Sequence, residues 1–320
     1  TIQKWRTSSM LWCCFTTLLL SRLTVQGSIH HPNHKMVFQM EEPNIKLVFN
    51  DFNIVVLTDV HSWVAGHVHQ EPHLDADYGD VLSFYERLRD LAASSPHKQH
   101  DLWFVSNGDF VHGTGLGAPE DPSHLIPILE KMPWDAVNCG NHELYDDVVV
   151  EYMTRPGGWV DWWGERYLTA NVRRVDGNLL GNEYRILTND YNEKKLLVFG
   201  FLYNMSGASE LIQIDQVEDV VKSKWFQTAA SLNDIDGILV LAHMDLQDPL
   251  VDVIRKALRK YAGDTMPIQF ITGHTHYRGT KTLDDYSVSF EAGRYLDTIG
   301  FVSFPSQESI VSGSSSSSSS

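Results

Sequence analysis

Apolar runs typical of buried strands recur along this chain and alternate with helical patterns. The runs are FNIVVLTD (52–59), DLWFVSNGD (101–109), WDAVNCGN (134–141), KLLVFGFL (195–202), DGILVLAH (236–243) and MPIQFITGH (266–274). Continuous apolar runs of this length suit strands buried on both faces. Helical spacing of apolar residues occurs between them, at 79–94, 122–132, 216–231 and 248–262. This alternation predicts an α/β fold of layered sheets and helices, closed by antiparallel strands at 287–293 and 298–304.

Metal-capable side chains follow five of these predicted strands. They are Asp59, His61, Asp109, Asn141, His142, His243, His274 and His276. Ligands of open α/β sheets bind at the carboxyl ends of the strands, so we expect these side chains to converge there. A mixture of carboxylate, amide and imidazole donors suits Zn, Mn or Fe. Two metal ions need a bridging carboxylate, and Asp109, alone on its turn, is the natural bridge.

The order of these motifs carries a family resemblance. The segments DVH (59–61), GD (108–109), GNHE (140–143), AH (242–243) and GHTH (273–276) resemble the calcineurin-like metallophosphoesterase superfamily. GDFVHGTGL (108–116) and TANV (169–172) resemble its 5'-nucleotidase-like branch, and ADYGD (76–80) is similar to fungal secreted or vacuolar members. The resemblance covers residues 53–305. It implies a four-layer αββα sandwich with a dinuclear metal site at the carboxyl ends of the strands.

The same resemblance implies a role for each site residue. One divalent ion would be held by Asp59, His61, Asp109 and His276, and the other by Asp109, Asn141, His243 and His274. His142 and Asp109 are the expected catalytic residues. His142 would contact the phosphoryl group or protonate the leaving oxygen, and we expect a neighbouring carboxylate, Asp109, to orient it.

The implied activity is hydrolysis of small phosphomonoesters, with a nucleoside monophosphate as a candidate substrate and attack on phosphorus by a metal-activated hydroxide. Ser62 departs from the branch, which more often has Gly directly after the histidine of the first motif. The chain also ends in serines where members of the branch continue into a C-terminal domain that grips the nucleoside. A phosphodiesterase or protein phosphatase on the same scaffold, or a noncatalytic metal-binding fragment, therefore stays open. The oligomeric state is open as well.

Charge and cysteine content exclude other classes of function. The chain has 25 basic and 41 acidic residues, a formal net charge of −16, which argues against a nucleic-acid partner. Cys13 and Cys14 lie in the N-terminal apolar stretch, so Cys139 stands alone in the body and no disulfide framework is expected. The histidines of GHVHQEPH (66–73) lie outside the five motifs, and we expect them in a polar loop near the rim of the site.

The two ends of the chain differ from its body in composition. Residues 1–27 are expected to be a signal peptide, because Lys4 and Arg6 precede the apolar run 10–20 and small residues then suit cleavage before Ser28. The run is short for a membrane span, although an uncleaved anchor is the alternative. We therefore expect the secretory pathway, with an extracellular or vacuolar destination and no stable membrane insertion after cleavage. Residues 36–305 form the predicted metallophosphoesterase domain, and 309–320 a flexible, Ser-rich low-complexity tail.

Overall fold

The computed structural model describes residues 16–20, 47–67, 71, 74–94, 98–112, 115–117 and 121–316. Most of the predicted signal peptide lies outside these residues; its segment Thr16–Leu20 is the strand β1. The predicted Ser-rich tail begins inside the helix α8 (Gln307–Ser316), and its last residues, 317–320, lie outside the described part.

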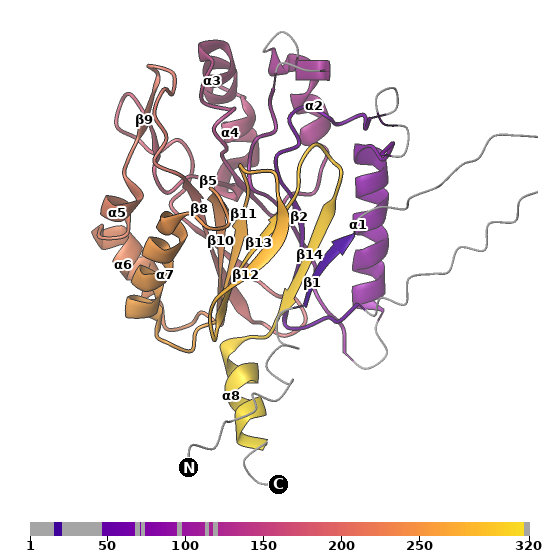
Figure 1. The fold of residues 1–320 in the computed structure, drawn as a ribbon, viewed down its shortest axis with the longest axis vertical. Helices are drawn as coiled ribbons and strands as arrows, with labels where there is room; N and C mark the ends of the chain where they lie inside the picture. Colours follow the sequence, from indigo (N-terminus) through magenta and orange to yellow (C-terminus); the bar gives the residue numbers. More distant parts are fainter. Residues whose placement is uncertain are drawn as a thin grey trace, which may run out of the picture.

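Two six-stranded sheets and a two-stranded ribbon make up the β structure of the described residues (Figure 1). The first sheet has the order β1 (Thr16–Leu20), β14 (Ile299–Phe304), β2 (Phe52–Leu57), β3 (Trp103–Ser106), β4 (Ala136–Asn138), β5 (Tyr167–Leu168). Strands β2 to β5 are parallel, and β14 runs antiparallel to both β2 and β1. The carboxyl ends of β2, β3 and β4 therefore lie at one edge of this sheet.

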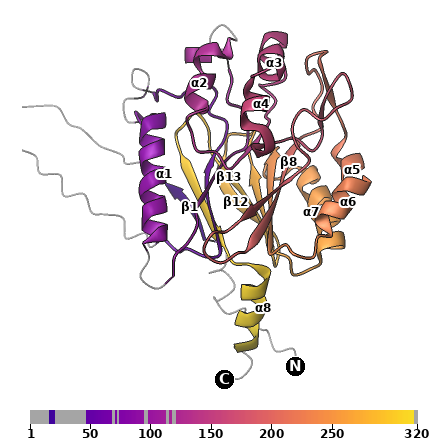
Figure 2. The ribbon, with the colours of Figure 1, turned by 180° about the vertical axis from the view of Figure 1, so that it is seen from behind.

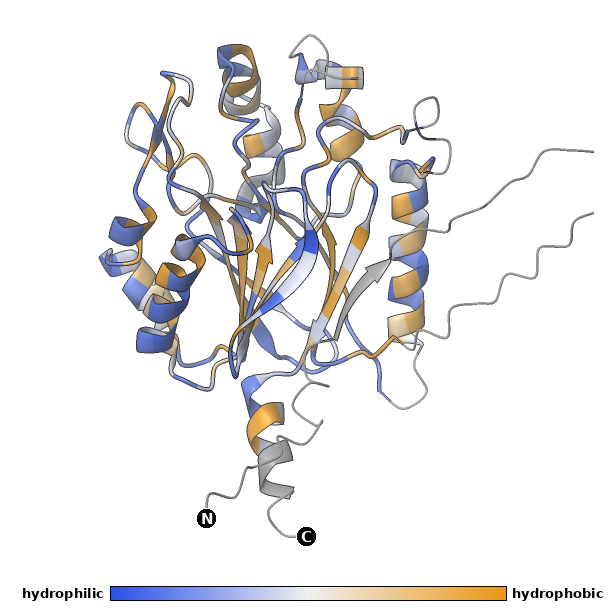
Figure 3. Ribbon diagram, viewed as in Figure 1, coloured by the Kyte–Doolittle hydropathy of each residue, from blue (hydrophilic) through white to orange (hydrophobic). Residues whose placement is uncertain are grey.

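The second sheet also has parallel central strands, but it carries one antiparallel strand at each of its two edges. Its order is β12 (Arg278–Asp284), β13 (Ser287–Ala292), β11 (Ile268–Thr272), β10 (Gly237–His243), β8 (Lys195–Leu202), β7 (Arg185–Thr188). The four central strands are parallel, and both edge strands are antiparallel to their neighbours. The edge strand β12 is largely exposed and polar (Figure 3), which protects an open sheet edge from pairing with other chains. The ribbon pairs β6 (Val172–Arg174) with β9 (Ile212–Ile214).

Helices cover the outer faces of both sheets, α1 on one side and α5 to α7 on the other, as Figures 1 and 2 show from opposite directions. The helices are α1 (Tyr78–Ala93), α2 (Ile126–Leu129), α3 (Asp147–Thr154), α4 (Trp159–Trp163), α5 (Val217–Val220), α6 (Lys224–Ala230), α7 (Pro249–Ala262) and α8. None of the helices in the described part of the chain combines the length and apolar character that a membrane crossing requires.

Three hydrophobic clusters match the boundaries between layers. One joins the facing sides of the two sheets, with Ile54 and Val56 of β2 in the same cluster as Leu239 and Leu241 of β10. A second packs the first sheet against α1, and a third packs the second sheet against α5, α6 and α7. Three buried interfaces separate four layers, so the predicted αββα architecture is confirmed.

Local sequence signals set the helix starts that were predicted. Asp77 within ADYGD accepts hydrogen bonds from the main-chain N–H groups of Gly79 and Asp80, which makes it the N-cap of α1. Asp248 caps α7, where Pro249 occupies the first turn without losing a hydrogen bond.

The structure departs from the sequence predictions in three places. The helix expected over 122–132 is reduced to a 3-10 turn, Pro122–His124, followed by the short helix α2. The helix expected over 216–231 is broken, because Ser223 adopts extended backbone and its Oγ accepts from Phe226 N to start α6 anew. Strand β13 pairs parallel with β11 and antiparallel only with β12, whereas two antiparallel closing strands were expected. Strand β14 is antiparallel to β2, as predicted.

Candidate metal centre

All seven predicted metal ligands lie where strands of the two sheets end. Asp59, His61, Asp109 and Asn141 follow β2, β3 and β4 of the first sheet, and His243, His274 and His276 end or follow β10 and β11 of the second. Five of them adopt left-handed backbone, with φ between 47° and 75°: Asp59, His61, Asp109, His274 and His276. Non-glycine residues avoid this conformation unless their surroundings impose it, so such a concentration indicates a functional site.

The first group of converging donors consists of Asp59, His61 and His276. The two imidazole Nε2 atoms of His61 and His276 lie 3.0 Å apart. Asp59 Oδ1 lies 3.6 Å from His276 Nε2 and 4.0 Å from His61 Nε2. One donor atom from each of the three residues lies within 4.8 Å of the other two, which is close enough for all three to bind a single ion.

The second group consists of Asp109, His243 and His274, and Asn141 belongs to it by distance. Asn141 Oδ1 lies 3.0 Å from His243 Nε2 and 2.8 Å from His274 Nδ1. Asp109 Oδ2 lies 3.2 Å from His243 Nε2. The other ring nitrogen of His243, Nδ1, hydrogen-bonds Asn107 O at 2.8 Å, which fixes the ring with Nε2 toward the site.

Asp109 lies between the two groups. Its Oδ2 is 3.5 Å from His61 Nε2 of the first group as well as 3.2 Å from His243 Nε2 of the second. Its Oδ1 accepts a hydrogen bond from the main-chain N of His142. The side chain of Asp109 is 1% exposed, so bulk water has almost no access to either oxygen.

Glu143, the last residue of the GNHE motif, holds this loop in place. Its Oε1 accepts from Phe110 N and Val111 N, and its Oε2 accepts from Asp109 N and Gly140 N, at 2.7–3.0 Å. The sequence had marked Glu143 only as part of the motif. Its carboxylate instead stabilises the turn that carries Asp109, by accepting hydrogen bonds from the main chain of that turn.

Glycine is required where the second and third ligand loops touch. Gly108 has φ +90°, and a Cβ added there would lie 2.2 Å from Gly140 N. A Cβ on Gly140 would lie 2.1 Å from Asp109 Oδ1. These contacts explain why the carboxylate and the amide ligand each follow a glycine.

Burial and mutual charge shift the pKa values of the acidic ligands in opposite directions. Burial, with the neighbouring Asp109 charge, raises the pKa of Asp59 to about 7. Burial also acts to raise the pKa of Asp109, but the charges of His243 and His61 outweigh it and hold that pKa well below its usual range. Asp109 is thus an anion facing imidazoles from both groups.

The pKa values of the histidine ligands also shift in opposite directions. Burial disfavours the charged form of His243, yet the carboxylates of Asp109 and Asp59 prevail and raise its pKa to about 10. Burial lowers the pKa of His61 to about 3 and, together with the charge of Arg294, that of His276 to about 4. Neutral imidazole is the form that binds a metal ion.

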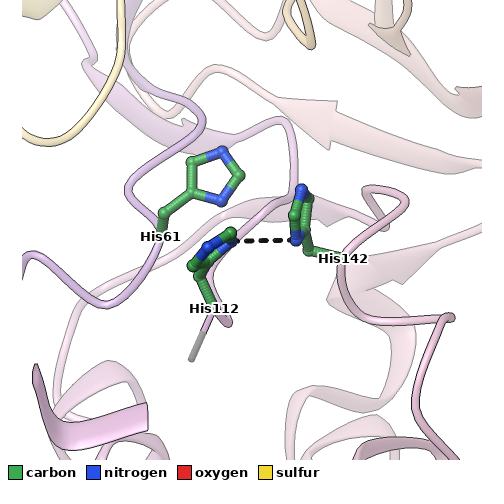
Figure 4. A group of neighbouring side chains, drawn as sticks. All are labelled: His61, His112 and His142. Carbon is green, nitrogen blue, oxygen red and sulfur yellow. Dashed lines mark hydrogen bonds between the residues drawn. The ribbon is translucent and has the colours of Figure 1, made fainter. Parts of the chain in front are cut away.

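His142 lies beside the first group, but Asp109 contacts only its main chain. The ring of His142 instead meets His112, with the two Nδ1 atoms 3.0 Å apart (Figure 4). His61 packs edge-on against both rings, at centroid distances of 4.6 Å to His142 and 5.2 Å to His112. His112 lies in the segment GDFVHGTGL (108–116) but was not among the predicted site residues, although its position three residues after Asp109 could have suggested it.

The remaining residues lie outside both donor groups, and His67 is buried although a polar loop near the rim was expected. His67 stacks on Trp63 and its Nε2 lies 2.5 Å from Tyr295 O, while His69 and His73 are outside the described residues. Arg294 Nη1 lies 3.4 Å from His276 Nδ1. Cys139 is buried and has a free thiol, in agreement with a structural role.

The donor set fits hard-to-intermediate divalent ions. Imidazole nitrogens, carboxylate oxygens and one amide oxygen converge in two groups that share Asp109. No thiolate takes part among the described residues. This chemistry suits Zn, Mn or Fe.

Comparison with known proteins agrees with this geometry. Residues 52–278 match the model of the calcineurin-like phosphoesterase family. An uncharacterized protein of Schizosaccharomyces pombe is 31% identical over 268 residues, which are 80% of this chain and 43% of that protein. A protein of Arthroderma benhamiae named "Secreted protein" is 29% identical and covers 82% of this chain and 40% of its own length. The chain thus spans less than half the length of these relatives.

Solved structures share the fold. The 5'-nucleotidase of Candida albicans superposes with a TM-score of 0.74 at 29% identity, over 82% of this chain and 48% of that one. A putative 5'-nucleotidase of Staphylococcus aureus superposes at 0.57 with 16% identity, over 78% of this chain and 50% of the other, and so shows likeness of fold alone. On the extent of the family match and the convergence of its motifs on one site, the chain belongs to the calcineurin-like phosphoesterase family.

Proposed function

We propose that this chain hydrolyses phosphomonoesters with two divalent metal ions, in the manner of a 5'-nucleotidase. The observation that carries the proposal is the position of Asp109, whose Oδ2 lies 3.5 Å from His61 and 3.2 Å from His243. A carboxylate shared by two donor groups is what a two-metal site requires. The 5'-nucleotidase of Candida albicans supports a nucleoside monophosphate as the substrate class.

In this proposal Asp59, His61, Asp109 and His276 would hold one ion, and Asp109, Asn141, His243 and His274 the other. When bound, the ions polarise the phosphoryl oxygens and activate a water toward phosphorus. The chain itself supplies the acid. His142 gives a proton to the ester oxygen, which takes the electron pair of the breaking P–O bond as the water oxygen bonds to phosphorus. One proton of the attacking water stays on the phosphate and the other replaces the proton lost by His142, so the products are the alcohol and inorganic phosphate.

The proposed location is the secretory pathway, with an extracellular or vacuolar destination. The basic and apolar segments at 1–27 support it, as does the relative named "Secreted protein". A small phosphate ester is the proposed partner, and the acidic net charge of −16 gives no support to a nucleic-acid ligand.

Metal analysis followed by a substrate panel tests the activity. Purified protein should contain two divalent ions per chain and should hydrolyse p-nitrophenyl phosphate and AMP faster than bis-p-nitrophenyl phosphate or a phosphopeptide. His243→Ala should lose metal and reduce kcat/KM by more than about 100-fold, the upper range for loss of an outer partner of a metal ligand. His124→Ala, an exposed histidine near α2, is the matched control and should keep both properties.

Each other outcome has a distinct meaning. Preference for the diester would favour a phosphodiesterase, and preference for the phosphopeptide a protein phosphatase. Metal binding without turnover of any substrate would favour the noncatalytic alternative and would refute the proposed activity.

A further inference from the structure

We propose that His112 is a positioning residue for His142, and that Ser62 fixes His112 in place for that purpose. This inference rests on the proposed function, since it concerns how the proton donor of that reaction is oriented. It adds two residues that neither the motif pattern nor the ligand set assigns.

The contact between the two rings carries the proposal. Nδ1 of His112 lies 3.0 Å from Nδ1 of His142, and the ring centroids are 4.6 Å apart. Only one of two facing nitrogens can carry the hydrogen, so a donating His142 requires an accepting His112. Figure 4 shows Nδ1 of His142 toward His112 and its other nitrogen directed away from that ring. The contact therefore determines which nitrogen of His142 remains for substrate.

No carboxylate performs this task for the ring in the described residues. Asp109, the side chain expected to orient His142, accepts from its main-chain N through Oδ1. Glu143 is occupied by four main-chain N–H groups. Tyr145 meets His142 edge-on at 5.5 Å between centroids and hydrogen-bonds Asn141 through its hydroxyl group. An imidazole thus occupies the place of the expected orienting group.

Ser62 holds the main chain of His112 from two directions. Its Oγ donates to His112 O at 3.0 Å and lies 3.1 Å from His112 N, which donates to it. Its own N–H donates to Phe110 O at 2.7 Å. Ser62 is buried and has φ 66°, a conformation in which Gly would be less strained. A serine at this strained position is explained if its hydroxyl group is needed to hold the main chain of His112.

The three-histidine group of His61, His112 and His142 also allows a competing interpretation as a further metal site. His61 argues against it, because its Nε2 already lies 3.0 Å from His276 Nε2 and 3.5 Å from Asp109 Oδ2. Positioning leaves His61 with the first donor group.

The test compares His112→Ala with His112→Asn in the full chain. Asn places a polar atom near the position of Nδ1, whereas Ala removes it. We expect His112→Ala to lower kcat about 10- to 100-fold with KM nearly unchanged, and to lower it more for AMP than for p-nitrophenyl phosphate, whose leaving group needs no proton. His112→Asn should recover most of the loss. Ser62→Gly should show a smaller loss of the same kind.

Two further measurements distinguish positioning from folding or metal binding. His112→Ala introduced into His142→Ala should cause no additional loss, because a residue that acts through His142 has no effect without it. Long-range 15N–1H spectra of histidine-labelled, metal-free protein should show the His142 Nδ1 signal shifted by His112→Ala and not by the control His124→Ala. This readout does not depend on activity.

The inference is overturned if His112→Ala retains full kcat, if its loss adds to that of His142→Ala, or if His112→Asn is no better than His112→Ala. A fall in metal content on His112→Ala would assign His112 as a ligand instead. Absence of activity in the parent protein refutes the proposed function, whereas an active parent with normal His112 variants refutes only this inference.

Discussion

Asp109 Oδ2 lies 3.2 Å from His243 Nε2, and both side chains are almost fully buried. The two residues come from different sheets, since Asp109 follows β3 and His243 ends β10. In the absence of metal this contact is an ion pair, because the carboxylate raises the pKa of His243 to about 10. Binding of an ion by this donor group requires the imidazole to give up that proton.

The first prediction follows from this competition. Because His243 holds its proton up to a pH of about 10, metal binding should release a proton across the neutral range. The apparent metal affinity should then rise with pH, up to about 10-fold per pH unit for one proton released. Chelator competition at pH 6, 7 and 8 measures this slope. Affinity that does not change with pH would remove His243 from the ligand set.

His142→Ala should reduce kcat without removing metal. Its ring is not a member of either group that shares Asp109, and loss of a proton donor costs about 100- to 10,000-fold in rate. Steady-state kinetics and metal analysis of the same preparation provide the measurement. Parent-like turnover would show that another group protonates the ester oxygen. Loss of metal would show that His142 binds it.

Glu143→Gln should destabilise the site although it changes no volume. An amide offers one accepting oxygen where the carboxylate serves four N–H groups, so two buried donors lose their acceptor. Unsatisfied buried donors cost about 1–3 kcal/mol each, which gives a decrease of about 2–6 kcal/mol in the free energy of unfolding. Urea unfolding followed by tryptophan fluorescence measures it. Glu151→Gln, an exposed change on α3, should have no effect, and equal stability of both variants would contradict the role given to Glu143.

Asp51 allows a prediction about acid stability far from the metal ligands. Its buried carboxylate accepts from Lys98 Nζ at 2.8 Å, from Ser306 N and Oγ, and from Ser309 Oγ. Burial acts to raise the pKa, but these hydrogen bonds prevail and hold it well below its usual range. A depressed pKa in the folded state adds stability above the unfolded value of about 3.9, and this stability is lost as pH falls through the folded pKa.

Asp51→Asn should therefore lower the free energy of unfolding by about 1–3 kcal/mol at pH 7. The difference between parent and variant should shrink as pH falls below about 4, because the carboxyl of the unfolded parent then binds a proton while the folded one stays ionised. Urea unfolding at pH 7 and pH 3 measures both values. A difference of the same size at both pH values would show that the charge of Asp51 contributes nothing.

The interruption of the helix at Ser223 could not be predicted from the local pattern of apolar residues. Apolar spacing across 216–231 continues through the break, so periodicity predicts one helix. Ser223 is also a good N-cap, and its hydroxyl accepts from Phe226 N once the preceding turn has ended. Packing of α5 and α6 against the second sheet chooses between these two local options. The same holds for β13, whose parallel pairing with β11 depends on the return of the chain through β12.

The sequence by itself determined the α/β class, because apolar period is a local property of the chain. Its strand-end motifs carried the resemblance that implied the four layers and the family. The sequence also predicted the residues that converge at the candidate metal centre, since parallel strands bring their carboxyl ends to one edge. Only the tertiary structure decided that Asp109 stands between donors from two sheets, and that His142 faces His112 and not a carboxylate. Those contacts depend on how loops that are far apart in sequence pack against one another where the two sheets meet. Hydrogen bonds between such loops leave no periodic pattern in the sequence.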